Sequence, residues 1–228
     1  MPTINSFIRF LHAAPGASAV DIYTDGNLVL KNIAYNEISE YLVVGPEIMH
    51  IQVFSAGEAS TPLIDTELNI PPSETITVAI IGISPDISLL PIFLNVAVRD
   101  NDDALIRFTH LSPEAPDVNL SIEGGDTLFS DVGYTQVTEY EVIEPGSYTL
   151  QLRIANGDDT VLASGTIEVK PRNAYTVYAI GLAEKDPAIE IGYFTDLSPF
   201  FSNEIKPTVF RKDTSSTSNA PKINLIYK

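Results

Sequence analysis

An internal repeat is the feature that most constrains how this chain of 228 residues can fold. The string IRFLH at residues 8–12 returns as IRFTH at residues 106–110, and further landmarks follow both copies in the same order. These landmarks are Pro15 and Pro113, Val20 and Val118, Gly26 and Gly124, Tyr35 and Tyr134, and Tyr41 and Tyr140. Because the copies span roughly residues 7–98 and 105–201, one structural unit is used twice in the chain.

Each copy has the pattern of β-structure. Apolar and polar residues alternate in VDIY at residues 20–23 and in VNLSI at residues 118–122, which is the period of a half-buried strand. Clusters of Gly, Pro, Asn and Asp separate such runs, and no long window combines a helical period with helix start and stop signals. About seven short strands in about 95 residues predict an all-β protein of two tandem antiparallel β-sandwich domains, immunoglobulin-like or transthyretin-like.

The repeat also sets the expected domain boundaries. Residues 1–98 are predicted to form the first β-sandwich, and residues 105–201 the second. RDNDDA at residues 99–104 is predicted to be a polar hinge between them, because it is almost entirely polar. Residues 202–228 match neither copy and are expected to form an extended C-terminal tail.

Composition excludes several classes of function. Thirty acidic residues against thirteen basic ones give a net charge of −17, which argues against nucleic acid or an anionic membrane as a partner. No apolar run approaches the ~20 residues of a membrane span, so membrane insertion is not expected. The first ten residues show no secretory signal. The lack of cysteine excludes disulfides, thiolate metal sites and cysteine nucleophiles.

Several motifs together resemble a known bacterial family. They are His-Ala-Ala-Pro at residues 12–15, Val-Asp at 20–21, Asp-Gly at 25–26, Tyr-x5-Tyr at 35–41, and Tyr-Thr-Val-x-Ala-x-Gly at 175–181. This set is similar to the family known as domain of unknown function 4397. The resemblance implies tandem domains and an association with cell envelopes and secreted surface proteins. The family has no established catalytic residues that could be assigned to this chain. The sequence departs from the family pattern at Asn119, where the first copy has Asp21, and the first copy lacks the tyrosine of the final motif.

The repeated histidine is predicted to be structural. In an extended strand Ile8, Phe10 and His12 share one face, so the ring should point inward at the strand end. A buried ring needs hydrogen-bond partners, which the following proline-rich loop can supply from its backbone. We therefore expect two equivalent structural corners, formed by His12 with Pro15 and by His110 with Pro113.

The alternatives for this histidine are a metal site and acid–base catalysis. A metal site in the first copy would pair His12 with Asp21, but the second copy has the uncharged Asn119 in that place. One histidine and one carboxylate are also too few ligands for a stable zinc site. The sequence has no Gly-x-Ser-x-Gly elbow, P-loop or His-Glu-x-x-His motif. We therefore predict no catalytic residue, no metal and no cofactor.

Two further patterns have a structural and a functional interpretation. The acidic segments at residues 99–104 and NGDD at 156–159 contain oxygen ligands that suit calcium, but their spacing is not that of an EF-hand. Asp and Asn are also ordinary turn residues, and we favour that interpretation. The paired tyrosines of Tyr-x5-Tyr would suit a carbohydrate groove, but large residues in a sandwich more often fill the core or cover an edge.

The tail differs in charge from the rest of the chain. Residues 202–228 contain five basic and two acidic residues, a net +3, so residues 1–201 carry −20. DTSSTSNAP at residues 213–221 has the composition of a flexible linker. The final segment is β-prone and places Ile223, Leu225 and Tyr227 on one face. We predict that residues 222–227 form a donor strand that pairs with a sheet edge on a neighbouring subunit.

These expectations favour a non-enzymatic structural or adhesive surface protein. It would be a homo-oligomer or polymer, a subunit of a self-assembling bacterial fibre, appendage or spore- or cell-surface layer built by strand exchange. It would then be located outside the cell or on the cell or spore surface. The alternative is a β-sandwich module that binds carbohydrate or peptide in a groove lined by exposed aromatic residues.

Overall fold

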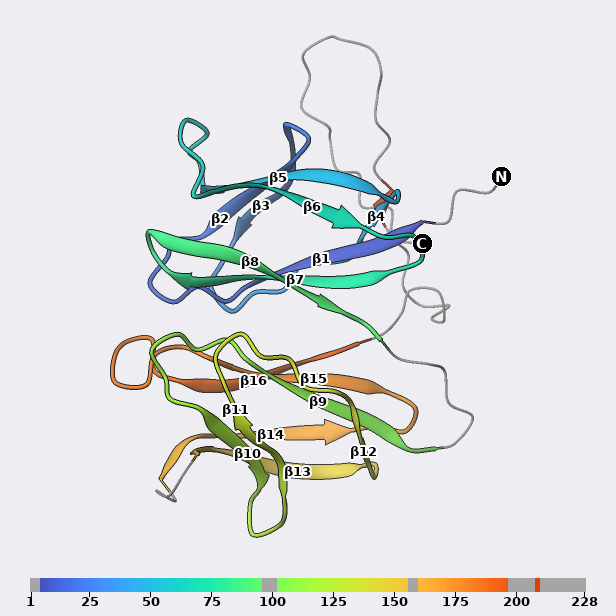
Figure 1. Ribbon diagram of the computed structural model, residues 1–228, viewed down its shortest axis with the longest axis vertical. Helices are drawn as coiled ribbons and strands as arrows, with labels where there is room; N and C mark the ends of the chain where they lie inside the picture. The colour runs from blue at the N-terminus through green and yellow to red at the C-terminus, as the bar shows by residue number, and fades with distance from the viewer. Residues whose placement is uncertain (1–4, 96–101, 156–159, 197–207, 210–228) are drawn as a thin grey trace.

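The computed structural model describes residues 5–95, 102–155, 160–196 and 208–209. Within these ranges every regular element is a β-strand, and there is no helix that could cross a membrane. The strands form two domains, one stacked on the other, and each domain has two sheets (Figure 1). The prediction of two tandem β-sandwich domains is therefore confirmed.

The first domain has sheets of strand order β4-β1-β7-β8 and β3-β2-β5-β6. The strands of its first sheet are β1 (Ser6–His12), β4 (Leu42–Val44), β7 (Thr75–Ile83) and β8 (Asp86–Phe93). Those of its second sheet are β2 (Val20–Thr24), β3 (Asn27–Ile33), β5 (Glu47–Ser55) and β6 (Ile64–Ile70). One strand of the tail, β17 (Thr208–Val209), joins the outer edge of β4.

The second domain repeats this topology, with sheets of order β12-β9-β15-β16 and β11-β10-β13-β14. The strands of the first of these sheets are β9 (Ala104–His110), β12 (Glu141–Ile143), β15 (Ala174–Ile180) and β16 (Glu190–Thr195). Those of the other sheet are β10 (Val118–Ile122), β11 (Thr127–Val132), β13 (Gly146–Ile154) and β14 (Val161–Val169). The sequence repeat is thus a repeat of the whole domain.

One strand pair in each domain departs from the antiparallel pattern that the sequence led us to expect. β1 runs parallel to β7, with Phe7 opposite Thr75 and His12 opposite Ile80, and β9 runs parallel to β15 in the same way. Parallel neighbours need a long crossover connection. The strands between β1 and β7 in the sequence provide that connection, so a parallel pair at the sheet centre is compatible with antiparallel pairing elsewhere.

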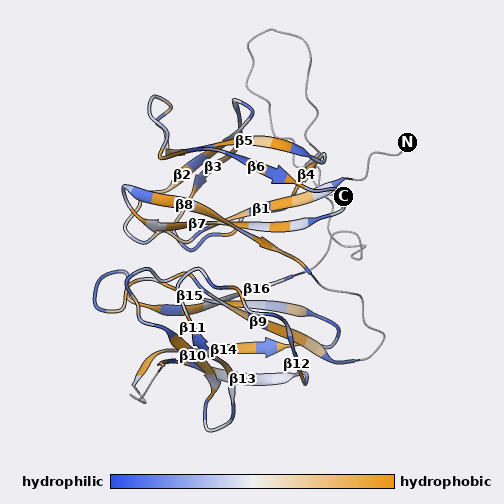
Figure 2. Cartoon of the chain, in the orientation of Figure 1, coloured by the Kyte–Doolittle hydropathy of each residue, from blue (hydrophilic) through white to orange (hydrophobic). Residues whose placement is uncertain are grey.

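Each sandwich encloses a core built from equivalent residues. Ile8 and Phe10 of β1 are fully buried, and so are Ile106 and Phe108 of β9. Full burial of an apolar side chain of this size contributes about 1.5–3 kcal/mol. Figure 2 shows hydrophobic residues along the strands of both domains.

The first strand of each domain is buried on both faces. All seven residues of β1 and all seven of β9 are buried. Alternate residues face the core of their own sandwich, and the residues between them, such as Arg9 and Arg107, face the other domain. The sheet that contains β1 and the sheet that contains β9 therefore pack against each other (Figure 1).

The structure describes the polar hinge expected at residues 99–104 only from Asp102 onward. Oδ1 of Asp102 lies 3.0 Å from Nη2 of Arg172, in an ion pair, and Ala104 is the first residue of β9. Both residues belong to the second domain. Ala104, the last residue of the predicted hinge, is therefore already part of a strand.

Candidate functional site at the interdomain interface

An apolar cluster joins the two domains. Leu11 of β1 and Leu111, which follows β9, are fully buried in it. The cluster also contains Ala13, Ala79, Ile81, Ile92, Tyr178, Ile180 and Phe194. Since both domains contribute apolar side chains, contact between the facing sheets removes hydrophobic surface from water and holds the domains together.

Two arginines from the repeated motif extend into this interface in the same way. Nε of Arg9 donates a hydrogen bond to Oγ1 of Thr77 at 2.9 Å. Nε of Arg107 donates to Oγ1 of Thr176 at 2.8 Å. Each arginine is thus held by a threonine on the parallel neighbour strand of its own domain, β7 or β15.

Each guanidinium group also binds the opposite domain. Nη2 of Arg9 donates to the carbonyl of Thr195 at 3.2 Å, and Nη1 of Arg107 donates to the carbonyl of Phe93 at 2.8 Å. Thr195 and Phe93 occupy equivalent places at the ends of β16 and β8. The two domains therefore meet through the same surface, in the manner of an isologous dimer interface contained in one chain.

A single carboxylate lies between the two guanidinium groups. Oδ1 of Asp196 is 3.5 Å from Nη2 of Arg9, and Oδ2 is 3.6 Å from Nη2 of Arg107. Oδ2 also accepts hydrogen bonds from the hydroxyl of Tyr140, at 2.6 Å, and from that of Thr176. The side chain of Asp196 is 2% exposed, so this charge is almost completely removed from water.

The first copy has no counterpart of this carboxylate. The amide of Leu94 donates to the carbonyl of Thr75, as the amide of Asp196 donates to that of Ala174, so Leu94 occupies the equivalent place. Burial raises the pKa of Asp196 above its ordinary value, and the neighbouring guanidinium of Arg107 acts in the opposite direction. One carboxylate therefore serves two buried arginines.

Aromatic rings cover both arginines. The guanidinium carbon of Arg9 lies 4.5 Å from the ring centroid of Tyr41 and 4.5 Å from that of Phe194. That of Arg107 lies 4.4 Å from the ring of Tyr140. These are cation–π distances, and burial raises the pKa of Tyr41 to about 12. The second tyrosine of each Tyr-x5-Tyr motif therefore packs on an arginine.

The structure places His12 and His110 at equivalent corners, each fully buried. Nε2 of His12 lies 3.0 Å from the carbonyl of Ser18, and Nε2 of His110 lies 3.1 Å from that of Pro116. The other ring nitrogen of each histidine accepts a hydrogen bond from the backbone amide two residues further along. Both rings are thus bonded to backbone within their own domain, in the chain that follows the strand.

The prolines of the two corners are buried beside the histidines. Pro15 and Pro113 each begin a turn, and each is followed by a residue with a positive φ, which is 74° at Gly16 and 65° at Glu114. Glycine adopts this conformation without strain, and the second copy holds a glutamate in it. The first tyrosine of each Tyr-x5-Tyr motif lies edge-on to the corner histidine, with ring centroids 6.1 and 6.2 Å apart.

Asp21, which the sequence offered as a metal ligand beside His12, binds backbone amides instead. Oδ1 of Asp21 accepts from the amide of Asn32 at 2.7 Å, and Oδ2 accepts from that of Gly57 at 2.9 Å. Asn119 accepts from the amide of Asp131 at 2.8 Å, which an uncharged side chain can also do. Among the described residues no group of three or more His, Asp or Glu side chains could hold a metal ion. NGDD at 156–159 lies outside the described residues.

The predicted donor strand also lies outside the described residues, with its side chains Ile223, Leu225 and Tyr227. The described part of the tail is β17, which pairs with β4 of its own chain. Thr208 is opposite Leu42, and the pairing is parallel.

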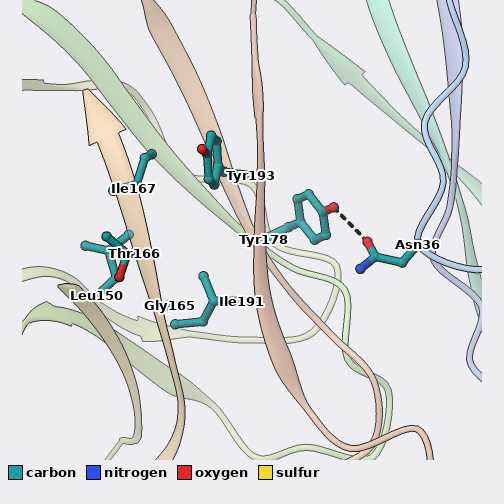
Figure 3. Close-up of a pocket in the computed structure, with 9 residues that line it drawn as sticks. Asn36, Leu150, Gly165, Thr166, Ile167, Tyr178, Ile191 and Tyr193 are labelled. Atoms are coloured by element: carbon teal, nitrogen blue, oxygen red, sulfur yellow. Dashed lines mark hydrogen bonds between the residues drawn. The ribbon is translucent and has the colours of Figure 1, made fainter. Parts of the chain in front are cut away.

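Two hollows lie beside the interface. The larger, of about 510 Å³, separates the β7–β8 turn of the first domain from the corner of the second domain that contains Pro113. The smaller, of about 230 Å³, lies around β16 (Figure 3). There Tyr178 extends from β15 toward Asn36 of the first domain, and its hydroxyl donates to Oδ1 of Asn36 at 2.8 Å. A side chain on Gly192 would collide with the Tyr178 ring, so glycine makes this arrangement possible.

Our sequence reasoning missed the residues at the centre of the interface, Arg9, Arg107 and Asp196. A signal for them was present, because TITVAIIGI at Thr75–Ile83 is almost continuously apolar. Such runs are typical of strands that are buried on both faces. β7 pairs with β1, which contains Arg9, so the second face of this sheet was also a candidate for burial. The same argument applies to Arg107 of β9, which pairs with β15.

The fold and this interface define a class of tandem β-sandwich protein whose two domains share one buried contact. The chain belongs to the family described as "Domain of unknown function (DUF4397)", whose model matches residues 6–121 and 121–206. The resemblance seen in the sequence is thus confirmed. None of the curated proteins compared with the chain matches it.

Solved structures give only distant likenesses. The Bacillus anthracis TIE protein has 10% identity and a TM-score of 0.26 over 77% of this chain, which spans about a third (33%) of that chain. A family 26 carbohydrate-binding module, CBMbc of Eubacterium rectale Amy13K, solved with maltoheptaose, has 9% identity and a TM-score of 0.28, covering 86% of this chain and 98% of its own. At these TM-scores neither likeness bears on the function of this protein.

Replacing Asp196 tests the charge balance of the interface. Asp196→Asn keeps the shape of the side chain but leaves two buried guanidinium groups without a countercharge. We expect the free energy of unfolding, measured by urea denaturation, to fall by about 3–5 kcal/mol. The matched triple variant Arg9→Met, Arg107→Met, Asp196→Leu removes all three charges and should lose less. A fall of less than about 1 kcal/mol for Asp196→Asn would contradict this account.

The corner histidines predict a pH dependence of stability. Burial lowers the pKa of His12 and of His110 below 6.5. The unfolded chain then binds protons that the folded chain does not, so stability is fully present above about pH 6.5 and is lost as the pH falls below that value. Urea denaturation at about pH 7.5 and about pH 5.5 should show this loss.

Variants separate the corner histidines from other groups. Replacing either His12 or His110 with Ala should cost about 1–3 kcal/mol at neutral pH, since backbone groups lose their partner. The double variant should also have a weaker pH dependence. His50→Gln is measured alongside, so that any contribution of this exposed histidine, which lies 2.6 Å from Asp65, is separated from that of the corner histidines. An unchanged pH dependence in the double variant would refute the assignment.

Proposed function

We propose that this protein is a non-enzymatic structural or adhesive component of a bacterial surface. Copies would assemble into a fibre, an appendage or a spore- or cell-surface layer, with a tail strand of one copy added to a sheet edge of the next. The observation that carries the proposal is the pairing of β17 with β4, since a segment of the tail occupies a sheet edge. An edge strand presents unpaired backbone groups that can bind another strand.

The edge formed by β4 suits an added strand. Its three residues Leu42, Val43 and Val44 are all apolar, and β17 contributes only two residues to the pair. β17 thus pairs with two of the three residues of β4. A longer apolar strand, such as residues 222–227 of a neighbour, would pair along the whole of β4 in place of β17.

The equivalent edge in the second domain is unlike β4. Glu141 of β12 occupies the place of Leu42, because each is opposite the isoleucine that begins its Ile-Arg-Phe motif. Glu144 follows the same strand, where the first copy has Gly45. Charged side chains on an edge oppose strand addition. The edge at β4 would therefore be the acceptor, and the edge at β12 would be protected.

Charge supports contact between copies. The tail carries +3 and residues 1–201 carry −20, so a tail is attracted to the body of another copy as well as to its own. The exchange of a segment between identical chains retains the contacts made within one chain and is a low-cost route to assembly. The joined domains would supply a stiff repeating unit.

The described polar groups support a structural role. The corner histidines bind backbone atoms, and Asp196 and both buried arginines bind groups that join the domains. A catalytic histidine would need a ring nitrogen within reach of a substrate. Here the ring nitrogens of His12 and His110 are already bonded to backbone.

Deleting residues 213–228 tests the donor strand. The described domains end before this segment, so we expect both to stay folded, with unchanged circular dichroism and thermal unfolding. Assembly, followed by electron microscopy and analytical ultracentrifugation, should be lost. Filaments or sheets of normal appearance from the truncated chain would refute strand exchange.

A matched pair of substitutions tests the acceptor edge. Val43→Lys places a charge on β4, and Val142→Lys places the same charge at the equivalent position of β12, where the side chain is 53% exposed. Assembly should fail for Val43→Lys and persist for Val142→Lys. The reverse result would move the acceptor edge to β12, and loss of assembly in both would point to a general effect of charge rather than to strand addition.

A further inference from the structure

The larger hollow occupies one of two equivalent corners of the interdomain interface. At each corner the first tyrosine of a Tyr-x5-Tyr motif in one domain faces the turn after the long central strand of the other. Tyr134 forms a hydrogen bond with the backbone of Gly82, which precedes the β7–β8 turn. Gly181 holds the place of Gly82 in the second domain, and both glycines have a φ of 99°.

The corner that contains Tyr35 and Asn36 of the first domain is closed by side chains. Nδ2 of Asn36 donates to Oε1 of Glu190 at 2.8 Å, across the interface. Oδ1 of the same asparagine accepts from the hydroxyl of Tyr178 (Figure 3). Three polar side chains from the two domains are thus hydrogen-bonded to one another at this corner, beside the smaller hollow.

The other corner has shorter side chains in all three places. Thr135 stands in the place of Asn36, because each follows the first tyrosine of its motif. Ser88 stands in the place of Glu190, since Ser88 is opposite Ile81 and Glu190 is opposite Ile180. Strand register likewise places Ala79 at the position of Tyr178. Two of these shorter side chains, Ser88 and Thr135, line the groove of about 510 Å³.

The size and place of this groove suit a ligand. Pockets that bind small molecules have volumes of about 300–1,000 Å³ and occur preferentially at domain interfaces. Tyr134 is 37% exposed and lines the groove together with Pro113. The lining also contains Ser84, Ser88, Thr135, Asp86 and Glu114, which are hydroxyl and carboxylate side chains.

These groups match the chemistry of a sugar. An exposed tyrosine ring offers an apolar face for the C–H groups of a pyranose, while its hydroxyl end is polar. Serine and threonine hydroxyls both donate and accept hydrogen bonds, and the Asp86 carboxylate accepts them from sugar hydroxyls. Glu114 is paired with Nζ of Lys185 at 2.7 Å, so Asp86 and the net charge of −17 are what repel anionic ligands.

We infer that this groove, between the β7–β8 turn and the Pro113 corner, is a binding site for a neutral carbohydrate chain. A sugar ring packs on Tyr134, and its hydroxyl groups bind Ser88, Asp86 and Thr135. The inference does not depend on the proposed assembly, because the groove lies within a single chain. A surface protein with such a site would attach to a glycan independently of how its copies associate.

The test begins with the full-length protein on an array of neutral oligosaccharides, comprising α- and β-glucans, mannans and N-acetylglucosamine oligomers. The affinity for the strongest probe is then measured by isothermal titration calorimetry. The double variant Ser88→Glu, Thr135→Asn introduces into the groove the two residue types, Glu and Asn, that are hydrogen-bonded across the other corner. It should weaken binding by at least about tenfold.

Two further variants complete the test. The control variant Asn36→Thr, Glu190→Ser makes the opposite exchange at the closed corner, away from the groove. Its affinity for the sugar should stay within about threefold of that of the parent protein. Tyr134→Ala should abolish binding, and Tyr134→Phe should retain most of it. Each variant is first shown to unfold at the temperature of the parent. The inference is overturned if no neutral sugar binds, if the closing variant binds normally, or if a basic peptide of sequence IKPTVFRK binds while every sugar fails.

Discussion

The neutralisation of two buried arginines is the constraint on which the rest of the structure depends. A guanidinium group removed from water costs several kcal/mol unless it is paired and hydrogen-bonded. Arg9 and Arg107 each take a threonine hydroxyl and a tyrosine face from their own domain. The carbonyls come from the opposite domain, and one carboxylate, Asp196, serves both. The first domain alone lacks the carboxylate, and the second alone leaves Arg107 without its carbonyl. The two sheets therefore close on each other.

When two copies of a domain pack on each other, each residue of the contact has an equivalent in the other copy. The positions where the two copies differ give this protein its distinct features. At the centre, Asp196 in place of Leu94 supplies the missing charge. At the sheet edges, Glu141 in place of Leu42 distinguishes a protected strand from one that accepts the tail. At the corners, Ser88 stands in place of Glu190 on the side where the larger of the two hollows lies.

The fold was largely predictable, because β-sandwich strands have a period of two and the repeat fixed the number of domains. The corner histidines followed from the same strand phase, since His12 is in register with Ile8 and Phe10 of the core. The interface was not predicted. Its residues lie on the other face of those strands, and alternation says which residues share a face but not what covers it. The pairing of Arg9 with Asp196, 187 residues apart in the chain, depends on contact between domains that no local pattern describes.

The buried interface couples the two domains, so that they should unfold as one unit. Differential scanning calorimetry of the intact protein tests this most directly. If the buried arginines and Asp196 couple the domains, unfolding is a single cooperative transition whose calorimetric and van't Hoff enthalpies agree. Two separated transitions, each with the enthalpy of about half the chain, would show that the domains unfold independently and would contradict the account.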